Sequence, residues 1–370
     1  MKSYISAIGT ATPEYTTPQL EIADFMATSL QMDEKEKRRL QALYRASGIK
    51  YRSSVLKDYS STPGQYQFYS NTENFEPIPS VSQRMDLFKT EALKLGIIAV
   101  SQIFDEFSDF DKTKITHLIT VSCTGFYAPG LDIELIEAMD LPKNIQRSAI
   151  NFMGCYAAFN AIKLGDALCK ADNKARVLIV CVELCSIHFQ KLKDEDNLLA
   201  NTLFGDGAAA LLMTTQPSKG LNLFLENFYC DLAFEGKQEM AWQIGNYGFE
   251  MKLSSYVPDI IKSGIRQLTE KLLKNLHLSL EDIDKFAIHP GGKKILETIE
   301  KELGMSREDN KYAYQVLRDH GNMSSATIIF VIKALCKDLT EEDNHKRILS
   351  FAFGPGLTLE SMVTQVIWIK

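Results

Sequence analysis

The sequence lacks the features that mark membrane, secreted or nucleic-acid-binding proteins. No apolar run approaches the roughly 20 residues that a membrane-spanning helix needs. With 41 basic and 47 acidic side chains, the net charge of −6 leaves no basic excess to neutralise a nucleic-acid backbone. The segment from Met1 to Ile5 has no apolar stretch before a small-residue cleavage site, so we expect no signal peptide. The sequence therefore predicts a globular protein without a membrane span or a nucleic-acid partner.

Motifs for nucleotides and metals are also missing. There is no Walker loop, and no dinucleotide fingerprint follows a strand. Cys181, Cys185 and His188 are spaced superficially like zinc ligands, but no second ligand pair follows them, so we expect no metal site. Cysteine is sparse, and the odd total of seven cannot all pair, which favours the reduced thiols of a cytoplasmic protein.

Strand-like and helix-like segments alternate along the 370 residues, a length that suits two domains or one large unit. Apolar residues recur at three- and four-residue steps over 260–276, which predicts an amphipathic helix. This alternation favours an α/β layered fold. The predicted strands are 117–122, 176–183, 208–213, 286–289, 347–353 and 362–369, and a further apolar helix covers 323–335.

Two stretches, 58–83 and 229–248, show no periodicity and are predicted to be loops. Loops of this length often line a substrate site. The composition fits a pocket-lining loop and a plain surface insertion equally well.

The clearest local pattern lies around Cys155. A strand-like run meets Gly154, and a helical pattern begins directly after it. A thiol at the start of a helix experiences the positive end of the helix dipole and unpaired amide donors, which should lower its pKa and favour a nucleophilic thiolate. A buried structural cysteine is an equally good interpretation of this context.

A thiolate nucleophile needs a partner and donors that hold an oxyanion. His289 ends a strand-like run, and His320 precedes a glycine and Asn322; nothing local separates the two histidines. Without further context, Asn322 is best interpreted as a residue that caps the start of a helix. Arg45, Lys50 and Arg52 form a small basic patch that could hold phosphates or simply be a solvated helix end.

Five segments, taken together, stand in the order typical of one enzyme family. They are Gly154-Cys155 before a helix, 203–210 (LFGDGAAA), 289–292 (HPGG), 321–326 (GNMSSA) and 353–358 (FGPGLT). Their order and spacing resemble the type III polyketide synthases, the chalcone synthase-like family of the thiolase superfamily. Cys123-Thr124 resembles the bacterial branch. The resemblance implies a thiolase fold, five αβαβα layers made of two similar halves, with the nucleophile in residues 1–215 and the histidine and asparagine in 216–370.

The resemblance also implies roles. Cys155 would carry the acyl chain as a thioester, while His289 and Asn322 would hold the oxyanion during decarboxylation of malonyl-CoA. Phe204 would be a gate between the coenzyme A tunnel and the cavity. The enzyme, an acyltransferase, would be a cytoplasmic homodimer that condenses an acyl-CoA starter iteratively with malonyl-CoA. It would release a phenolic or pyrone product, need no cofactor beyond coenzyme A thioesters, and meet their phosphates with Arg45, Lys50 and Arg52.

Several positions depart from plant chalcone synthases and predict a reshaped cavity. Met251 replaces a second gating phenylalanine, and Trp242 stands near a position where the plant enzymes have glycine. Ala128 replaces a methionine that lines the partner subunit's cavity in those enzymes. Trp242 should shrink the cavity, whereas Ala128 should open it. The remaining expected cavity residues are Cys123, Thr124, Ser324 and Pro355.

Other readings of the same residues remain open. Ketoacyl-acyl-carrier-protein synthases, which perform one condensation, share the trio of Cys, His and Asn, but Pro290 stands here where they usually have Gln. Thiolases carry a second catalytic cysteine near the C-terminus, and residues 351–358 contain none. A catalytically silent scaffold of the same fold is the third reading, and the intact trio argues against it.

Overall fold

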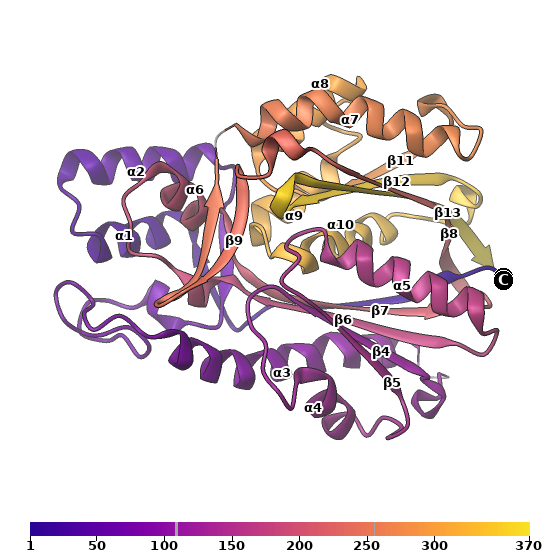
Figure 1. Cartoon of the computed structure of the whole chain (residues 1–370), viewed down its shortest axis with the longest axis horizontal. Helices are drawn as coiled ribbons and strands as arrows, with labels where there is room; N and C mark the ends of the chain where they lie inside the picture. Colours follow the sequence, from indigo (N-terminus) through magenta and orange to yellow (C-terminus); the bar gives the residue numbers. More distant parts are fainter. Residues whose placement is uncertain (108–109, 255) are drawn as a thin grey trace.

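The protein consists of alternating layers of helices and strands (Figure 1). The computed structural model describes residues 1–107, 110–254 and 256–370. The prediction of a layered α/β fold is confirmed, with helices above, between and below two groups of strands. Within the described residues, we find no helix with the length and apolar character required to cross a bilayer.

The first group of strands is built from the N-terminal part of the chain. In spatial order it contains β1 (Tyr4–Ala11), β7 (Asp206–Thr214), β6 (Arg176–Leu184), β4 (His117–Ser122) and β5 (Gln146–Asn151). The last three strands are parallel, whereas β7 is antiparallel to both of its neighbours. Every residue of β4 and β7 is buried, as expected for strands covered on both faces.

The second group of strands is built from the C-terminal part of the chain. It contains β8 (Gly220–Leu232), β13 (Thr358–Ile369), β12 (Arg347–Gly354) and β11 (Lys285–Ile288). The two groups are joined where β1 pairs with β8, through Tyr4 opposite Phe224 and Ile5 opposite Leu223. This short junction makes one continuous order of nine strands.

The helices form three layers around these strands. α3 (Val81–Glu106) contacts β1, β6 and β7, and α7 (Val257–Lys274) contacts β8 and β13 from the other outer side. α5 (Ala157–Ala171) and α10 (Thr327–Cys336) lie in the middle layer (Figure 1). The residues of α10 from 328 to 332 are all buried, because this helix has strands on both sides.

The amphipathic helix predicted for 260–276 is observed as α7. Its buried residues include Ile261, Ile265, Leu268 and Leu272, which follow the predicted three- and four-residue steps. The remaining elements near the site are α1 (Gln19–Ser29), α2 (Glu34–Ala46), β3 (Tyr51–Ser54), α4 (Leu131–Ala138), α6 (Glu195–Leu203), α8 (Lys293–Leu303) and α9 (Lys311–His320).

Of the two predicted loops, the first is confirmed over 61–80, where there is no helix or strand, and the second is wrong. The segment 58–83 is irregular, but it is no surface insertion, since Tyr59, Tyr66, Tyr69 and Phe75 are buried in an aromatic cluster around Phe25. The segment 229–248 is largely strand: β8 continues to residue 232, and β9 (Met240–Gly245) pairs with β10 (Gly248–Leu253) as a hairpin. Periodicity missed the hairpin because β9 is short and carries polar, aromatic and glycine residues together.

Candidate active site

The turn that carries Cys155 is held between the two halves of the chain. It connects β5 to α5, and Gly154 adopts a left-handed conformation with φ of 81°. A Cβ atom at Gly154 would lie 2.2 Å from Cδ of Pro355. A Cβ atom at Gly354 would lie 2.6 Å from a ring carbon of Tyr156. The glycine before Cys155 is therefore required both by backbone conformation and by close packing against the turn that follows β12.

Asn322 directs its amide toward the thiol. Its Oδ1 accepts hydrogen bonds from Ser324 N (2.8 Å) and Thr327 Oγ1 (3.3 Å). Both amide atoms lie 3.8 Å from Cys155 Sγ, so Nδ2 can donate to the sulfur and the neutral thiol can donate to Oδ1. The backbone of Asn322 pairs with the end of α6, because its N donates to Leu203 O and its O accepts from Gly205 N, both at 2.9 Å. Asn322 thus caps a local turn and faces the thiol at the same time.

His289 follows β11 directly and is completely buried. Its backbone N donates to Phe351 O of β12 at 2.9 Å, which places it beside the strand that leads into the Gly354-Pro355 turn. Within the described part of the chain, neither Nδ1 nor Nε2 of its ring has a hydrogen-bond partner. A buried imidazole with two unused nitrogens is unusual and indicates a group that meets its partner only when a ligand is present.

Burial keeps both groups uncharged in the ligand-free protein. Burial raises the pKa of the Cys155 thiol to about 12, although hydrogen bonds from Ser324 and Asn322 act in the opposite direction. Burial also lowers the pKa of His289 to about 3. The expectation that the helix start lowers the pKa of Cys155 is therefore wrong for the ligand-free protein, because loss of hydration outweighs the nearby amide donors.

This protonation state predicts how Cys155 reacts with iodoacetamide. Only the thiolate is alkylated, and its fraction rises about tenfold per pH unit at every pH below the thiol pKa. We expect the alkylation rate of Cys155, followed by mass spectrometry of peptides, to rise about tenfold per unit from pH 7 to pH 9. A rate that is already constant across this range would instead indicate a preformed thiolate–imidazolium pair.

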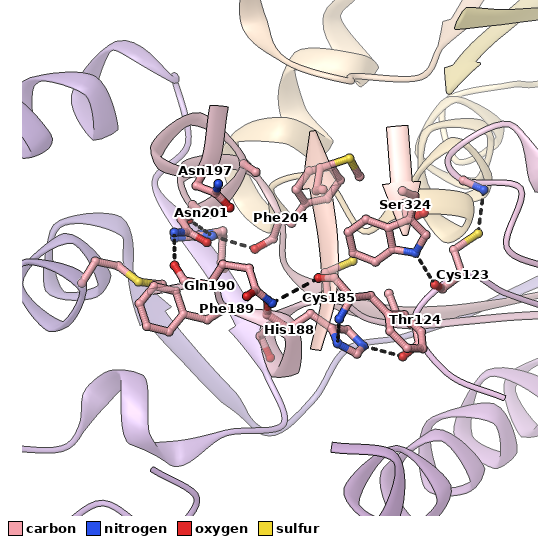
Figure 2. A pocket seen from close by; sticks show the side chains of 18 of the residues that line it. Cys123, Thr124, Cys185, His188, Phe189, Gln190, Asn197, Asn201, Phe204 and Ser324 are labelled. Carbon is pink, nitrogen blue, oxygen red and sulfur yellow. Dashed lines mark hydrogen bonds between the residues drawn. The ribbon is translucent and has the colours of Figure 1, made fainter. Parts of the chain in front are cut away.

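A cavity lies beside the Cys155 turn, and Gly154 is part of its lining (Figure 2). Six of the predicted gate and cavity residues line it, namely Phe204, Cys123, Thr124, Trp242, Met251 and Ser324. Trp242 and Met251 stand opposite each other on the β9–β10 hairpin. The indole Nε1 of Trp242 donates to Cys123 O at 2.6 Å, which fixes the ring in the cavity wall.

The other predicted residues lie elsewhere. Pro355 packs against Gly154 and supports the turn from outside the cavity. Ala128 is exposed beside the free edge of β5. Arg45 and Lys50 are exposed, whereas only 4% of Arg52 is exposed. The expected three-residue surface patch is therefore wrong, because the guanidinium of Arg52 turns inward and donates to backbone carbonyls of the interior.

A second cavity lies along α6. Leu203 lines this second cavity, while its neighbour Phe204 lines the first. Its lining includes Gly291, which lies two residues after His289, and the nearby Lys293 and Lys294. We refer to the cavity lined by Leu203 as the outer channel and to the cavity lined by Phe204 as the inner cavity, so two consecutive residues line the two spaces.

Sequence reasoning missed two residues that shape the inner cavity. His188 is buried, its Nε2 bonds to Thr124 O at 2.6 Å, and its Nδ1 accepts from Phe249 N at 3.0 Å. Burial lowers the pKa of His188 to about 3. The buried carboxyl of Glu183 bonds to Cys123 N, Thr124 Oγ1 and Ser325 Oγ, and burial raises its pKa. No local sequence signal distinguishes these residues from other strand-end residues.

Comparisons with known proteins agree with this architecture. Residues 1–217 match the family model "Chalcone and stilbene synthases, N-terminal domain", and residues 229–368 match the corresponding C-terminal domain. The chain is 30% identical over 367 residues to "Alpha-pyrone synthesis polyketide synthase-like Pks18" of Mycobacterium tuberculosis, covering 98% of this chain and 91% of that protein.

Solved structures show the same fold. The C-terminal type III polyketide synthase domain of Steely1 from Dictyostelium superposes with a TM-score of 0.89 and 27% identity, over 99% of this chain and all of that domain. PKS-I from the brown alga Ectocarpus siliculosus gives the same TM-score at 26% identity, over 99% of this chain and 98% of that one. These matches define a thiolase-fold acyltransferase.

The chain belongs to the chalcone and stilbene synthase family and is a type III polyketide synthase. The alternative of a single-condensation ketoacyl synthase is not favoured by any of these matches.

Proposed function

We propose that this enzyme condenses an acyl-CoA starter held on Cys155 with successive malonyl-CoA units and closes the chain to an α-pyrone. One observation carries the proposal: a buried thiol, the Nδ2 of Asn322 aimed at it, and a buried imidazole with both nitrogens unpartnered. Cys155 comes from residues 1–215, while His289 and Asn322 come from residues 216–370. The pyrone product is suggested by the name of the mycobacterial relative.

In the proposed acylation step, His289 accepts the thiol proton as Cys155 attacks the starter thioester, and coenzyme A leaves with a proton. Burial keeps the His289 imidazole neutral before substrate binds, so one ring nitrogen has a lone pair free to accept this proton. The resulting thioester on Cys155 is uncharged, and it removes the cost of keeping a thiolate in a buried site.

In the proposed condensation step, malonyl-CoA loses carbon dioxide and its α-carbon keeps the electron pair as an enolate. His289 and Asn322 donate to the enolate oxygen, which stabilises charge as it develops. The α-carbon then attacks the acyl carbonyl on Cys155, a carbon–carbon bond forms, and the sulfur leaves. Repeated transfer of the lengthened chain to Cys155 permits further rounds. An enol oxygen of the chain finally attacks the thioester carbonyl; the C–O bond closes the pyrone ring, the C–S bond breaks, and the leaving thiolate takes up the enol proton.

Incubation with malonyl-CoA and a panel of acyl-CoA starters tests this proposal. We expect carbon dioxide, free coenzyme A and a pyrone whose mass equals the starter plus two or more malonyl-derived units, detected by liquid chromatography and mass spectrometry. A product that stops after one condensation, or that requires carrier-protein-bound malonate, would support the ketoacyl synthase reading instead.

The outer channel is the proposed path of coenzyme A. Its lining is mostly apolar and includes Leu43, Leu199 and Val257, which suits a pantetheine arm. Lys293 and Lys294 lie along it, Arg45 is exposed in the last turn of α2, and Lys50 is exposed shortly after that helix. These four cations are the proposed phosphate contacts. No cofactor beyond the thioester substrates is proposed.

The indole of Trp242 should limit the size of the acyl group that the inner cavity accepts. Trp242→Ala removes a large ring from the wall, so we expect kcat/KM for a dodecanoyl-CoA starter to rise about tenfold relative to hexanoyl-CoA. Trp242→Phe is the matched control, since it keeps most of the volume but loses the hydrogen bond to Cys123 O. Equal changes in both variants would assign the effect to the hydrogen bond rather than to volume.

We also propose that the enzyme is a homodimer that pairs through β5. This strand ends the sheet, and its first four residues are exposed. An exposed strand edge offers unpaired backbone groups to a second copy. Phe126 and Ile133, each 41% exposed, lie beside Ala128 in the hollow along this edge.

Light scattering tests the proposed dimer. Phe126→Glu should shift the measured mass from two chains toward one, because it places a charge in the apolar contact. Phe234→Glu is the control, since Phe234 is 74% exposed but lies on η4 (Phe234–Gly236), outside the β5 hollow. A wild-type mass of one chain would contradict the proposal.

A further inference from the structure

Arg52 is a buried cation in the wall of the inner cavity. It lies on β3, only 4% of it is exposed, and it lines the same cavity as Phe204 and Ser324. Its Nε donates to Gln19 Oε1 at 2.9 Å. Its Nη1 donates to Asn201 O at 2.8 Å and to Phe204 O at 2.6 Å. These bonds hold the guanidinium rigidly against the end of α6.

The third nitrogen of this guanidinium is unused. Among the described residues, Nη2 of Arg52 has no hydrogen-bond acceptor, although the guanidinium lies over the ring of Tyr44 at 5.6 Å. The nearby carboxyl of Asp206 already accepts from Val55 N, Ser186 N and Ser186 Oγ. A buried charged donor without an acceptor is costly, and Arg52 lines the inner cavity, where a ligand oxygen would supply the missing acceptor.

Other polar side chains around the cavity donate their hydrogen bonds to acceptors of the protein itself. Trp242 donates to Cys123 O, Gln190 to His188 O, and Tyr59 to Ser186 O. Asn201 donates to Gln190 O. Arg52 Nη2 differs from all of these, since it is a buried donor on the cavity wall that still lacks an acceptor.

The position of Arg52 relative to the nucleophile suggests which oxygen it meets. Figure 2 shows Asn201 and Gln190 on one side of the cavity and Ser324 and Cys123 on the other, with Phe204 between them. Arg52 is bonded to Asn201 and Phe204, whereas Cys155 adjoins Asn322 and the Ser324 side. A chain that grows from Cys155 into the inner cavity would approach Arg52, which lines that cavity. A simple acyl starter brings no oxygen there, but each condensation adds one ketone.

We propose that Nη2 of Arg52 donates to a keto oxygen of the β-keto chain growing on Cys155, and that it thereby determines how far the chain is extended. This inference rests on the proposed function. An enolised keto oxygen carries negative charge, which a guanidinium in a low-dielectric cavity stabilises. No covalent step is assigned to Arg52.

Product length with hexanoyl-CoA and malonyl-CoA tests the inference by mutation. Arg52→Lys keeps a positive charge but loses the planar set of N–H donors of the guanidinium. We therefore expect the amount of products formed by two or more condensations, relative to the diketide formed by one, to fall about tenfold. Tyr44→Phe is the matched control: Tyr44 OH donates to Asn201 O, the same carbonyl that Arg52 holds, but it does not line the cavity. An equal fall in both variants, or no fall in Arg52→Lys, would overturn the inference.

A binding measurement tests the inference without changing Arg52. In the Cys155→Ala enzyme, 3-oxohexanoyl-CoA should bind about tenfold more tightly than hexanoyl-CoA, because only the former has the additional ketone. Equal Kd values would overturn the inference.

Decarboxylation of malonyl-CoA in the absence of starter tests a different role for Arg52. If Arg52→Lys lowered this decarboxylation, Nη2 would act on the malonyl carboxylate, and the assignment to the keto chain would be wrong. If the wild-type enzyme formed no condensation product at all, that result would contradict the proposed function itself and not only the role of Arg52.

Discussion

Cys155→Ala should reduce condensation of acyl-CoA with malonyl-CoA by at least about 10⁴-fold, since no other group in the turn can carry the acyl chain. The turn itself should survive the change, because Gly154, Pro355 and the start of α5 keep their packing. Product formation by mass spectrometry and thermal unfolding by circular dichroism measure these two effects separately.

The matched control is Cys169→Ala. Cys169 is also buried and lies on α5, at the other end of the helix from Cys155. Its removal should leave kcat/KM within about twofold, since it touches no part of the site. Peptide mass spectrometry after incubation with acyl-CoA alone should find the acyl group on Cys155. A wild-type adduct on a different cysteine would place the nucleophile elsewhere.

Asn322→Ala should reduce malonyl-CoA decarboxylation by about 10²- to 10³-fold, which is the usual effect of removing one oxyanion donor. Acylation of Cys155 should change far less, because His289 accepts the thiol proton in that step. Release of carbon dioxide and the rate of thioester formation on Cys155 measure the two steps independently.

Thr327→Val is the control for the orientation of the Asn322 amide. It removes one of the two donors to Oδ1, at 3.3 Å, and leaves the bond from Ser324 N. We expect a loss of about tenfold in decarboxylation, smaller than that of Asn322→Ala, since the amide is loosened but present. If Asn322→Ala impaired acylation and decarboxylation equally, the assignment of Asn322 to the enolate oxygen would be wrong.

Local sequence patterns predicted the elements that depend on local physics. The bend at Gly154 follows from a glycine between a strand and a helix, and α7 follows from its regular apolar spacing. The order of motifs along the chain predicted the family. The pairing of Asn322 with Leu203 and Gly205, residues that are far apart in sequence, could be anticipated only through that resemblance.

The features that local sequence could not predict all depend on burial by distant segments. The thiol pKa of Cys155 is set by dehydration, and the turn at Gly354-Pro355 contributes to it from the other half of the chain. Arg52 looked like a surface cation beside Arg45 and Lys50, but its acceptors lie at the end of α6. An alternation of residue types cannot distinguish an arginine at the surface from one that binds interior carbonyls.

The close fit between the Cys155 turn and the Gly354-Pro355 turn has a consequence during synthesis of the chain. A ribosome that has completed β5 and α5 has made the thiol but not the turn that packs against it, nor His289 or Asn322. The unfinished polypeptide therefore holds an ordinary cysteine without decarboxylating or condensing ability. On the proposed roles of these residues, we expect decarboxylation and condensation only after the chain has been made as far as Asn322 and its amide lies against Cys155.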